Sequence, residues 1–236
     1  MAADARAAEV RSIMRRGLLR LAINLVGVAA LLLIPAGSLR YWPGWIYLLL
    51  MAGFWSFFFM VLLRHDPQLL ARRMQRKEAE RAQRIFQRLF PVIIVAAFVT
   101  AGLDYRFGWS REMLGPVPLI VVLLAQALVA ASYWLVFWVM KTNSFAASTI
   151  QVEAEQTVID NGPYAFVRHP MYLGMTLMML ATPLALASYV AFPVFALQVP
   201  ILVYRLVHEE KTLCRDLPGY AEYCARTRRR LVPGLW

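Results

Sequence analysis

The sequence predicts an all-α, polytopic membrane protein with about six transmembrane helices, of which the last two form a hairpin. The first observation is composition: of 236 residues, 60% are hydrophobic and 17% are charged, and the mean hydropathy is +0.54. A soluble domain of this length is rarely so apolar. The second is that the apolar residues fall in separate runs, each near the roughly 20 helical residues that cross a bilayer core. The third is that positive charges are concentrated in alternate loops.

Four of the apolar runs are long enough to cross a bilayer as single helices. They cover residues 17–39, 42–63, 90–107 and 116–140. A further apolar block covers residues 171–207, and it is interrupted at Pro183, Ser188, Pro193 and Pro200. Because this block is about as long as two helices and its interruptions carry no charge, we expect a helical hairpin with a tight turn.

Three polar segments connect or follow these runs. Residues 67–89 mix many basic side chains with apolar ones, which suits an interfacial helix and equally a solvated connector helix. Residues 142–164 are polar with several β-branched side chains, which predicts an extended segment or a β-hairpin. The tail from His208 is too polar to span and predicts a helix, a turn at Pro218 and Gly219, and another helix.

The chain therefore divides into two regions. Residues 1–140 form an N-terminal four-span membrane region, with the interfacial helix near 67–89. Residues 141–236 contain the hairpin and nearly all of the unusual polar residues. We expect any functional site to lie in this C-terminal region.

The distribution of Lys and Arg predicts the orientation in the membrane. Five of them precede or open the first span, eight lie between the second and third spans, two lie between the fourth span and the hairpin, and seven follow it. The opposite loops hold three, which are Arg40, Arg106 and Arg111. Because positively charged loops stay in the cytoplasm, both termini and the segment around Arg168 are predicted to be cytoplasmic.

Charge and cysteine content argue against several other classes. The formal net charge of +11 is explained by cytoplasmic loops beside anionic lipid, so no nucleic-acid partner is expected. The first apolar run is too long for a signal peptide, so we expect the first span to be retained. Cys214 and Cys224 lie in the predicted cytoplasmic tail, where disulfides are rare, and they lack the spacing of metal ligands.

The segment "NGPYAFVRHPMYLG" places polar residues immediately before an apolar helix. Pro170 is well suited to the first helical turn, so Arg168 and His169 lie where the helix presents unpaired N–H groups that attract anions. The guanidinium of Arg168 also suits a carboxylate or phosphate. At the other end of the hairpin, on the same side, lie His208, Glu209 and Glu210. Together these groups predict a site for a zwitterionic or mixed-charge small molecule.

Each of these residues also has a simpler interpretation. Arg168 is typical of a positive-inside anchor, and Glu209 and Glu210 could neutralise Arg205 and Lys211. A metal site built from histidine and glutamate side chains is chemically reasonable, but no HxxxH or HExxH spacing supports it, and we predict no metal.

The order of these motifs resembles an integral-membrane methyltransferase family that includes isoprenylcysteine carboxyl methyltransferase and the phospholipid N-methyltransferases. The resemblance covers roughly the last 90 residues. The family's RHPxYxG element, paired glutamates and YxxY tail correspond to Arg168, His169, Pro170, Tyr172, Gly174, Glu209, Glu210, Tyr220 and Tyr223. Two positions depart from the prenylcysteine enzymes: Gln156 stands where they commonly carry His, and Pro218 and Gly219 replace Phe-Gly. These departures weaken the prediction of a prenylcysteine acceptor.

The resemblance implies that S-adenosyl-L-methionine binds in a cytoplasmic C-terminal pocket. The cofactor-binding residues that it implies are Gln156, Gly162, Pro163, Tyr164, Arg168, His169, Pro170, Tyr172, Gly174, Glu209, Glu210, Tyr220 and Tyr223. Arg168 and Glu210 are also the predicted catalytic residues. Such a cofactor carries a carboxylate, an ammonium and a sulfonium group, which fits the mixed charge inferred from the residues.

The sequence thus predicts methyl transfer to a small or lipid-like acceptor, a carboxylate, thiol or amine, at the boundary between membrane and cytoplasm. A neutral acceptor would need a general base, for which Glu210, Glu209 and His169 all remain open. One alternative is a sterol-reductase-like oxidoreductase that uses NADPH. Another is a non-catalytic membrane partner or transport component. Neither the acceptor nor the oligomeric state is predicted, and membrane lipids are the one other expected partner.

Overall fold

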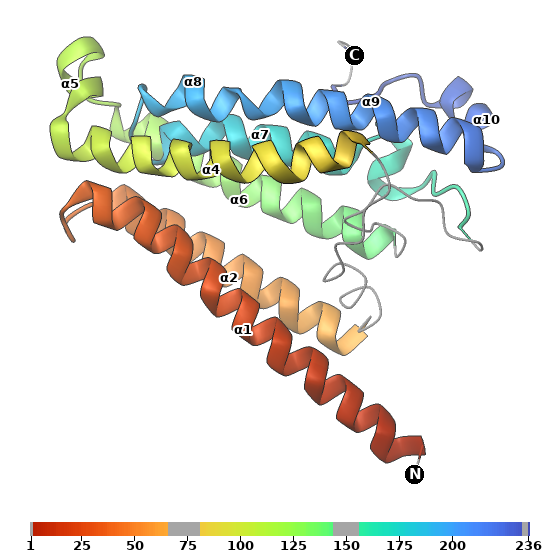
Figure 1. The fold of residues 1–236 in the computed structure, drawn as a ribbon. Coiled ribbons are helices and arrows are strands. Elements are labelled where there is room, and N and C mark those ends of the chain that lie inside the picture. The colour runs from red at the N-terminus through yellow and green to blue at the C-terminus, as the bar shows by residue number, and fades with distance from the viewer. Residues whose placement is uncertain (1, 66–80, 144–155, 233–235) are drawn as a thin grey trace.

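The computed structural model describes residues 2–65, 81–143, 156–232 and 236, and within these ranges it contains helices and no strand. The all-α prediction is confirmed. The helices are α1 (Ala2–Ala36), α2 (Trp42–His65), α4 (Arg81–Phe107), α5 (Trp109–Leu114), α6 (Leu119–Thr142), the 3₁₀ helix η1 (Gly162–Ala165), α7 (Pro170–Ala185), α8 (Ala191–Ala196), α9 (Gln198–Asp216) and α10 (Tyr220–Arg226). Figure 1 shows α4, α6 and α7 side by side with the line formed by α8 and α9, which follow each other end to end, while α1 and α2 diverge from this bundle.

Five of the described helical segments are long and apolar enough to cross a membrane, as expected for a multi-pass membrane protein. They are Arg11–Ala36, Trp42–Arg64, Phe86–Phe107, Leu119–Thr142 and Ala191–Asp216. The predicted hairpin is present as α7 followed by α8 and α9, which run alongside one another (Figure 1). Because α7 has only 16 residues, it is a shorter apolar helix, and the count of six spans stays a prediction.

The connecting segments differ in part from the expectation. The interfacial helix predicted near 67–89 lies for the most part outside the described residues and stays a prediction. Its last part, from Arg81, is helical and continues through Pro91 into the third span as α4. Residues 66–80, and most of the predicted extended segment at 144–155, lie outside the described residues. Residues 156–160 have no regular secondary structure.

The main core lies where α1, α2, α4, α6, α7 and α8 meet. Its fully buried side chains include Leu32, Ala97, Ala101, Val129 and Phe195. Small residues on α4 allow the backbones of α1 and α4 to lie in direct contact. A Cβ atom added at Gly102 would lie 2.5 Å from the Leu32 carbonyl oxygen. This glycine is therefore required by the close crossing of the two helices.

Polar side chains tie the helix connections together at the end of the bundle opposite the chain termini (Figure 1). The Asp104 carboxylate accepts hydrogen bonds from the backbone N–H and the hydroxyl of Ser110. The Ser110 hydroxyl oxygen in turn accepts the N–H groups of Tyr189 (2.8 Å) and Val190 (3.1 Å) in the turn between α7 and α8. These bonds satisfy turn N–H groups that would otherwise be costly away from water.

Two further buried side chains reach the same turn from other helices. The Tyr41 hydroxyl donates to the Leu186 carbonyl at 2.6 Å. The side-chain amide of Gln126 donates to the carbonyls of Pro43 (3.0 Å) and Ala185 (2.8 Å). The turn region of the hairpin is thus hydrogen-bonded to α5, to α6 and to the loop before α2, and through Ser110 it is linked to Asp104 on α4.

The crossing of α1 and α4 gives a stability prediction. We expect Gly102→Ala to lower stability by roughly 2 kcal/mol, because the new methyl group meets a backbone oxygen that cannot move alone. Gly53→Ala on α2 is the matched control, since a Cβ there meets no atom within 4 Å and alanine favours the helix. Thermal unfolding in detergent measures both. Equal melting temperatures for Gly102→Ala and the wild type would contradict the close crossing.

The predicted orientation can be tested with the two cysteines. Cys214 is exposed, whereas burial raises the pKa of the Cys224 thiol to about 11. Because the thiolate is the reactive form, Cys224 should alkylate slowly at pH 8. A membrane-impermeant maleimide should therefore label wild-type protein in inverted vesicles mainly at Cys214, and a Cys214→Ala variant should lose most of the signal. Labelling from the periplasmic or extracellular side alone would contradict the predicted orientation.

Candidate functional site

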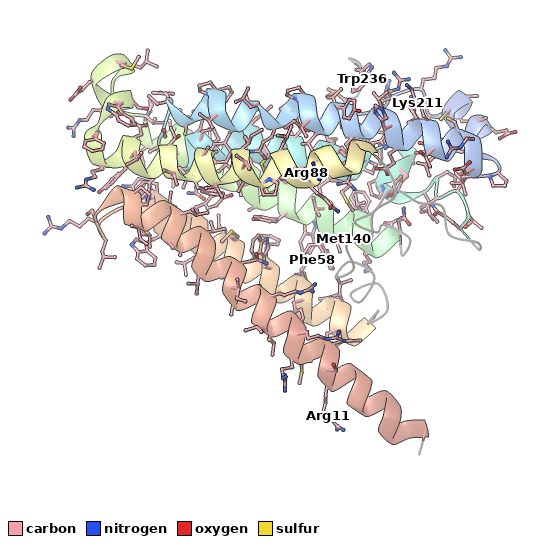
Figure 2. All side chains as sticks on the ribbon, in the orientation of Figure 1. Arg11, Phe58, Arg88, Met140, Lys211 and Trp236 are labelled. Carbon is pink, nitrogen blue, oxygen red and sulfur yellow. The ribbon has the colours of Figure 1, made fainter. Side chains whose placement is uncertain are left out.

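The polar residues singled out in the sequence gather at the end of the bundle where α7 begins and α9 ends. Pro170 occupies the first turn of α7, and His169 precedes it with a non-helical backbone that ends the irregular segment after η1. The tail after α10 lies against the same residues, and Figure 1 shows α10 and the C-terminus at this end of the molecule. Figure 2 shows Lys211 and Trp236 at this end as well.

Arg168 is buried and makes contacts in two directions. Its Nη2 atom lies 2.7 Å from Glu210 Oε1. Its Nη1 atom donates to the carbonyls of Cys224, Thr227 and Arg228 at 3.2–3.5 Å. These carbonyls lie at the C-terminal end of α10, where a cation is favourable because the last carbonyls lack helical partners. Arg168 therefore joins α9 to α10 and the tail.

Glu210 is 7% exposed and binds a cation on each carboxylate oxygen. Arg168 contacts Oε1, and Arg230 donates from Nε to Oε2 at 2.6 Å. His169 Nε2 lies 3.9 Å from Oε1. A buried carboxylate is tolerated only with such pairing, because its desolvation is otherwise costly. The predicted meeting of a cationic cluster and an acidic residue is present, as a direct ion pair.

Arg230 was not predicted. It belongs to the run "RTRRR", and nothing in the sequence separates it from its basic neighbours. The path of the backbone after α10 decides which of these arginines contacts Glu210. The backbone N–H of Arg168 donates to the Arg229 carbonyl at 2.9 Å, and the N–H of His169 donates to the Arg230 carbonyl at 3.0 Å. These two bonds fix the register that places the Arg230 side chain on Glu210.

The neighbouring Glu209 has different partners. The Tyr172 hydroxyl donates to Glu209 Oε2 at 2.5 Å, and the His169 and Tyr172 rings meet edge to face with centroids 5.9 Å apart. His208 Nδ1 lies 2.8 Å from the Tyr204 carbonyl oxygen, on its own helix. Among the residues that the structure describes, no group of three His, Cys, Asp or Glu side chains could hold a metal ion.

The segment Gly162–Pro163–Tyr164, called the GPY element below, is bonded to both the end of α6 and the YxxY motif. Gly162 has φ of +56°, and a Cβ there would lie 3.1 Å from Thr142 Oγ1, so this turn favours glycine. The Tyr164 hydroxyl accepts a hydrogen bond from the Asn143 side chain at 2.9 Å. The Tyr164 carbonyl accepts one from the Tyr223 hydroxyl at 2.8 Å. Tyr223 therefore connects α10 to the start of the site.

The remaining predicted site residues take mainly packing positions. Pro163 is buried in η1, and Gln156 is partly buried in the irregular segment before it. Gly174 lies against α6, where an added Cβ would be 2.9 Å from Val136 Cγ2. Gly174 thus permits close packing of α6 and α7.

Three polar atoms of this cluster are buried without a hydrogen-bond partner in the described part of the chain. They are Arg168 Nε, His169 Nε2 and the Tyr220 hydroxyl. Burial is the largest cause that raises the pKa of the Tyr220 phenol, which keeps it a neutral donor at physiological pH. Buried polar groups are normally paired, so these three atoms are exceptions within the described part of the chain.

Comparison with known proteins supports the resemblance seen in the motifs. Residues 120–217 match the model of the phospholipid methyltransferase family. This part of the chain is similar to phospholipid methyltransferases. The match runs from α6 to the end of α9, so it includes the RHPxYxG element and both glutamates, and it ends before the YxxY motif and the tail. A search among curated proteins finds no match to the chain.

The contacts of Arg168 give a second stability prediction. Arg168→Ala should lower stability by about 3–5 kcal/mol, because it leaves the buried Glu210 with one cation fewer and removes the donor for three tail carbonyls. Arg226→Ala is the matched control. It breaks an exposed ion pair with Asp160 (67% and 48% exposed side chains) and should cost under about 1 kcal/mol. Thermal unfolding in detergent should separate the two, and similar losses would show that the Arg168 contacts contribute little.

Proposed function

We propose that the chain is an S-adenosyl-L-methionine-dependent methyltransferase that acts on a small or lipid-like acceptor at the cytoplasmic face of a membrane. The family match implies a methyltransferase of the membrane-lipid or isoprenylcysteine type. The observation that carries the proposal is the convergence of Arg168 and His169, from the segment before α7, with Glu210 on α9, beside buried donors that have no hydrogen-bond partner among the described residues.

The residues present fit the charges of this cofactor. Arg168 Nε and His169 Nε2 are the atoms available to its carboxylate. The Glu210 carboxylate suits its ammonium or sulfonium group, and the rings of Tyr172 and Tyr220 can add cation–π contact. The remaining predicted residues of the GPY and RHPxYxG elements would hold the cofactor through their backbone or through packing.

The charge balance favours this cofactor over NADPH. Arg168 and Arg230 both bind Glu210, and Arg205 lies over the ring of Tyr172, whose hydroxyl binds Glu209. These three arginines and two glutamates carry a formal net charge of only +1. A cofactor with several phosphate groups would need an excess of cations in the site. A zwitterionic group with a sulfonium centre needs none.

The bound cofactor supplies a methyl group already activated for in-line displacement, so positioning and exclusion of water are the protein's main contributions. The tail from Thr227 to Val232 lies against the RHP element and limits access of water to it. A carboxylate or thiolate acceptor would need no base. For an amine acceptor, Glu210, Glu209 and His169 all remain candidates for the proton acceptor.

The same proposal assigns roles to the two regions. Residues 1–140 would form the membrane scaffold through which a lipid-like acceptor arrives, and residues 141–236 would bind the cofactor. Both termini and the site would face the cytoplasm, where the soluble cofactor is available.

Calorimetry on the detergent-purified protein tests this function. We expect S-adenosylmethionine and its demethylated product to bind to the wild type and NADPH not to bind. Tyr220→Phe should weaken binding by about three- to tenfold at unchanged stability, because it removes a hydroxyl that has no partner among the described residues. Tyr105→Phe, at the opposite end of the bundle, is the control. Binding of NADPH alone would favour the reductase, and binding of none of the three would favour a non-catalytic membrane protein.

A further inference from the structure

The tail residue Arg230 makes a contact that the family match does not cover, because the match ends at residue 217. Its Nε atom donates to Glu210 Oε2 at 2.6 Å. The side chain of Arg230 is 39% exposed, whereas that of Glu210 is 9% exposed. A partly solvated arginine from the end of the chain therefore completes the pairing of a buried carboxylate on a membrane helix.

The two arginines on Glu210 are held in different ways. Arg168 is fixed by three tail carbonyls in addition to Glu210. Arg230 is fixed by its backbone, whose carbonyl accepts the His169 N–H, and its guanidinium lies 5.4 Å from the ring centroid of Trp236. The Trp236 carbonyl oxygen accepts the N–H groups of Leu231 (2.9 Å) and Val232 (3.0 Å), which turns the chain end back onto itself. Arg230 thus connects Glu210, His169 and the chain end.

Two cations on opposite oxygens define the plane of the Glu210 carboxylate. The terminal torsion of a glutamate is otherwise broad, so one contact alone would leave the group free to turn. With Arg168 on Oε1 and Arg230 on Oε2, Oε1 faces His169 Nε2 at 3.9 Å. The orientation of the carboxylate that faces the unpaired histidine therefore depends on the tail.

We infer that Arg230 is a positioning residue of the candidate cofactor site, so that the site includes this one side chain of the segment after α10. The inference rests on the proposed function. Arg230 acts through Glu210: it holds the carboxylate in the orientation that receives a cationic group of the ligand, and it ties the tail to the RHP element. The cofactor site then extends beyond the hairpin to the C-terminal segment.

The test uses the full-length protein with the variants Arg230→Ala, Arg230→Lys and Arg229→Ala. Arg229 is the matched control, because it is the adjacent tail arginine and its side chain is exposed. Binding of the demethylated cofactor product should weaken about tenfold in Arg230→Ala, recover in part in Arg230→Lys, and stay unchanged in Arg229→Ala. In a Glu210→Gln background, Arg230→Ala should add less than about a twofold loss, because the two residues act as one unit.

Hydrogen exchange of the ligand-free protein supplies a second readout. The tail amides of Leu231 and Val232 and the amides of Arg168 and His169 should exchange faster in Arg230→Ala, and Arg229→Ala should leave them unchanged. An unchanged affinity in Arg230→Ala would overturn the inference, as would an equal loss with and without Glu210. If the wild type binds neither the cofactor nor its product, the proposed function fails, and with it the binding role of Arg230. Faster amide exchange in Arg230→Ala would in that case show that Arg230 stabilises the position of the C-terminal segment only.

Discussion

The buried carboxylate of Glu210 is the group on which the geometry of the polar end of the molecule depends. It lies near the end of an apolar helix, where an unpaired charge would be strongly unfavourable. Arg168 and Arg230 compensate it from two separate segments, and each of them carries further bonds. Arg168 caps the end of α10, and the backbones of residues 168–169 and 229–230 pair. The start of α7, the end of α9, α10 and the tail are thus all positioned relative to one carboxylate.

The opposite end of the bundle is organised by a different requirement. Backbone groups in the turns between membrane helices need partners where water is scarce. Ser110, Tyr41 and Gln126 supply them to the turn between α7 and α8. The hairpin is therefore held firmly at its turn, while its open end carries the polar cluster. By contrast, α1 and α2 approach the bundle near this turn and diverge from it toward the open end (Figure 1).

This division suits chemistry at a membrane boundary. Helix ends are the places in a membrane protein where polar groups can gather at low cost, and α7 and α9 bring two such ends together. In the resulting cluster both oxygens of Glu210 are paired with arginines, and a small number of buried donors have no partner among the described residues. Under the proposed function, such a site would bind a compact zwitterionic ligand through a few directed contacts.

The sequence by itself determined the helical membrane architecture and the identity of most residues in the cluster. Apolar length and loop charge are local properties, so the first four spans and the hairpin could be predicted without any knowledge of packing. The motif around Arg168 and the glutamate pair could be recognised because their spacing lies within short segments.

Only the tertiary structure decided which partners these residues take. The pairing of Arg168 with Glu210 depends on how the hairpin closes. The contact of Arg230, out of the run "RTRRR", with Glu210 depends on a backbone register between residues 168–169 and residues 229–230. The continuity of α4 from Arg81 through Pro91 to Phe107 is likewise seen only in the structure. Contacts of this kind arise between segments far apart in the chain, and no local pattern encodes them.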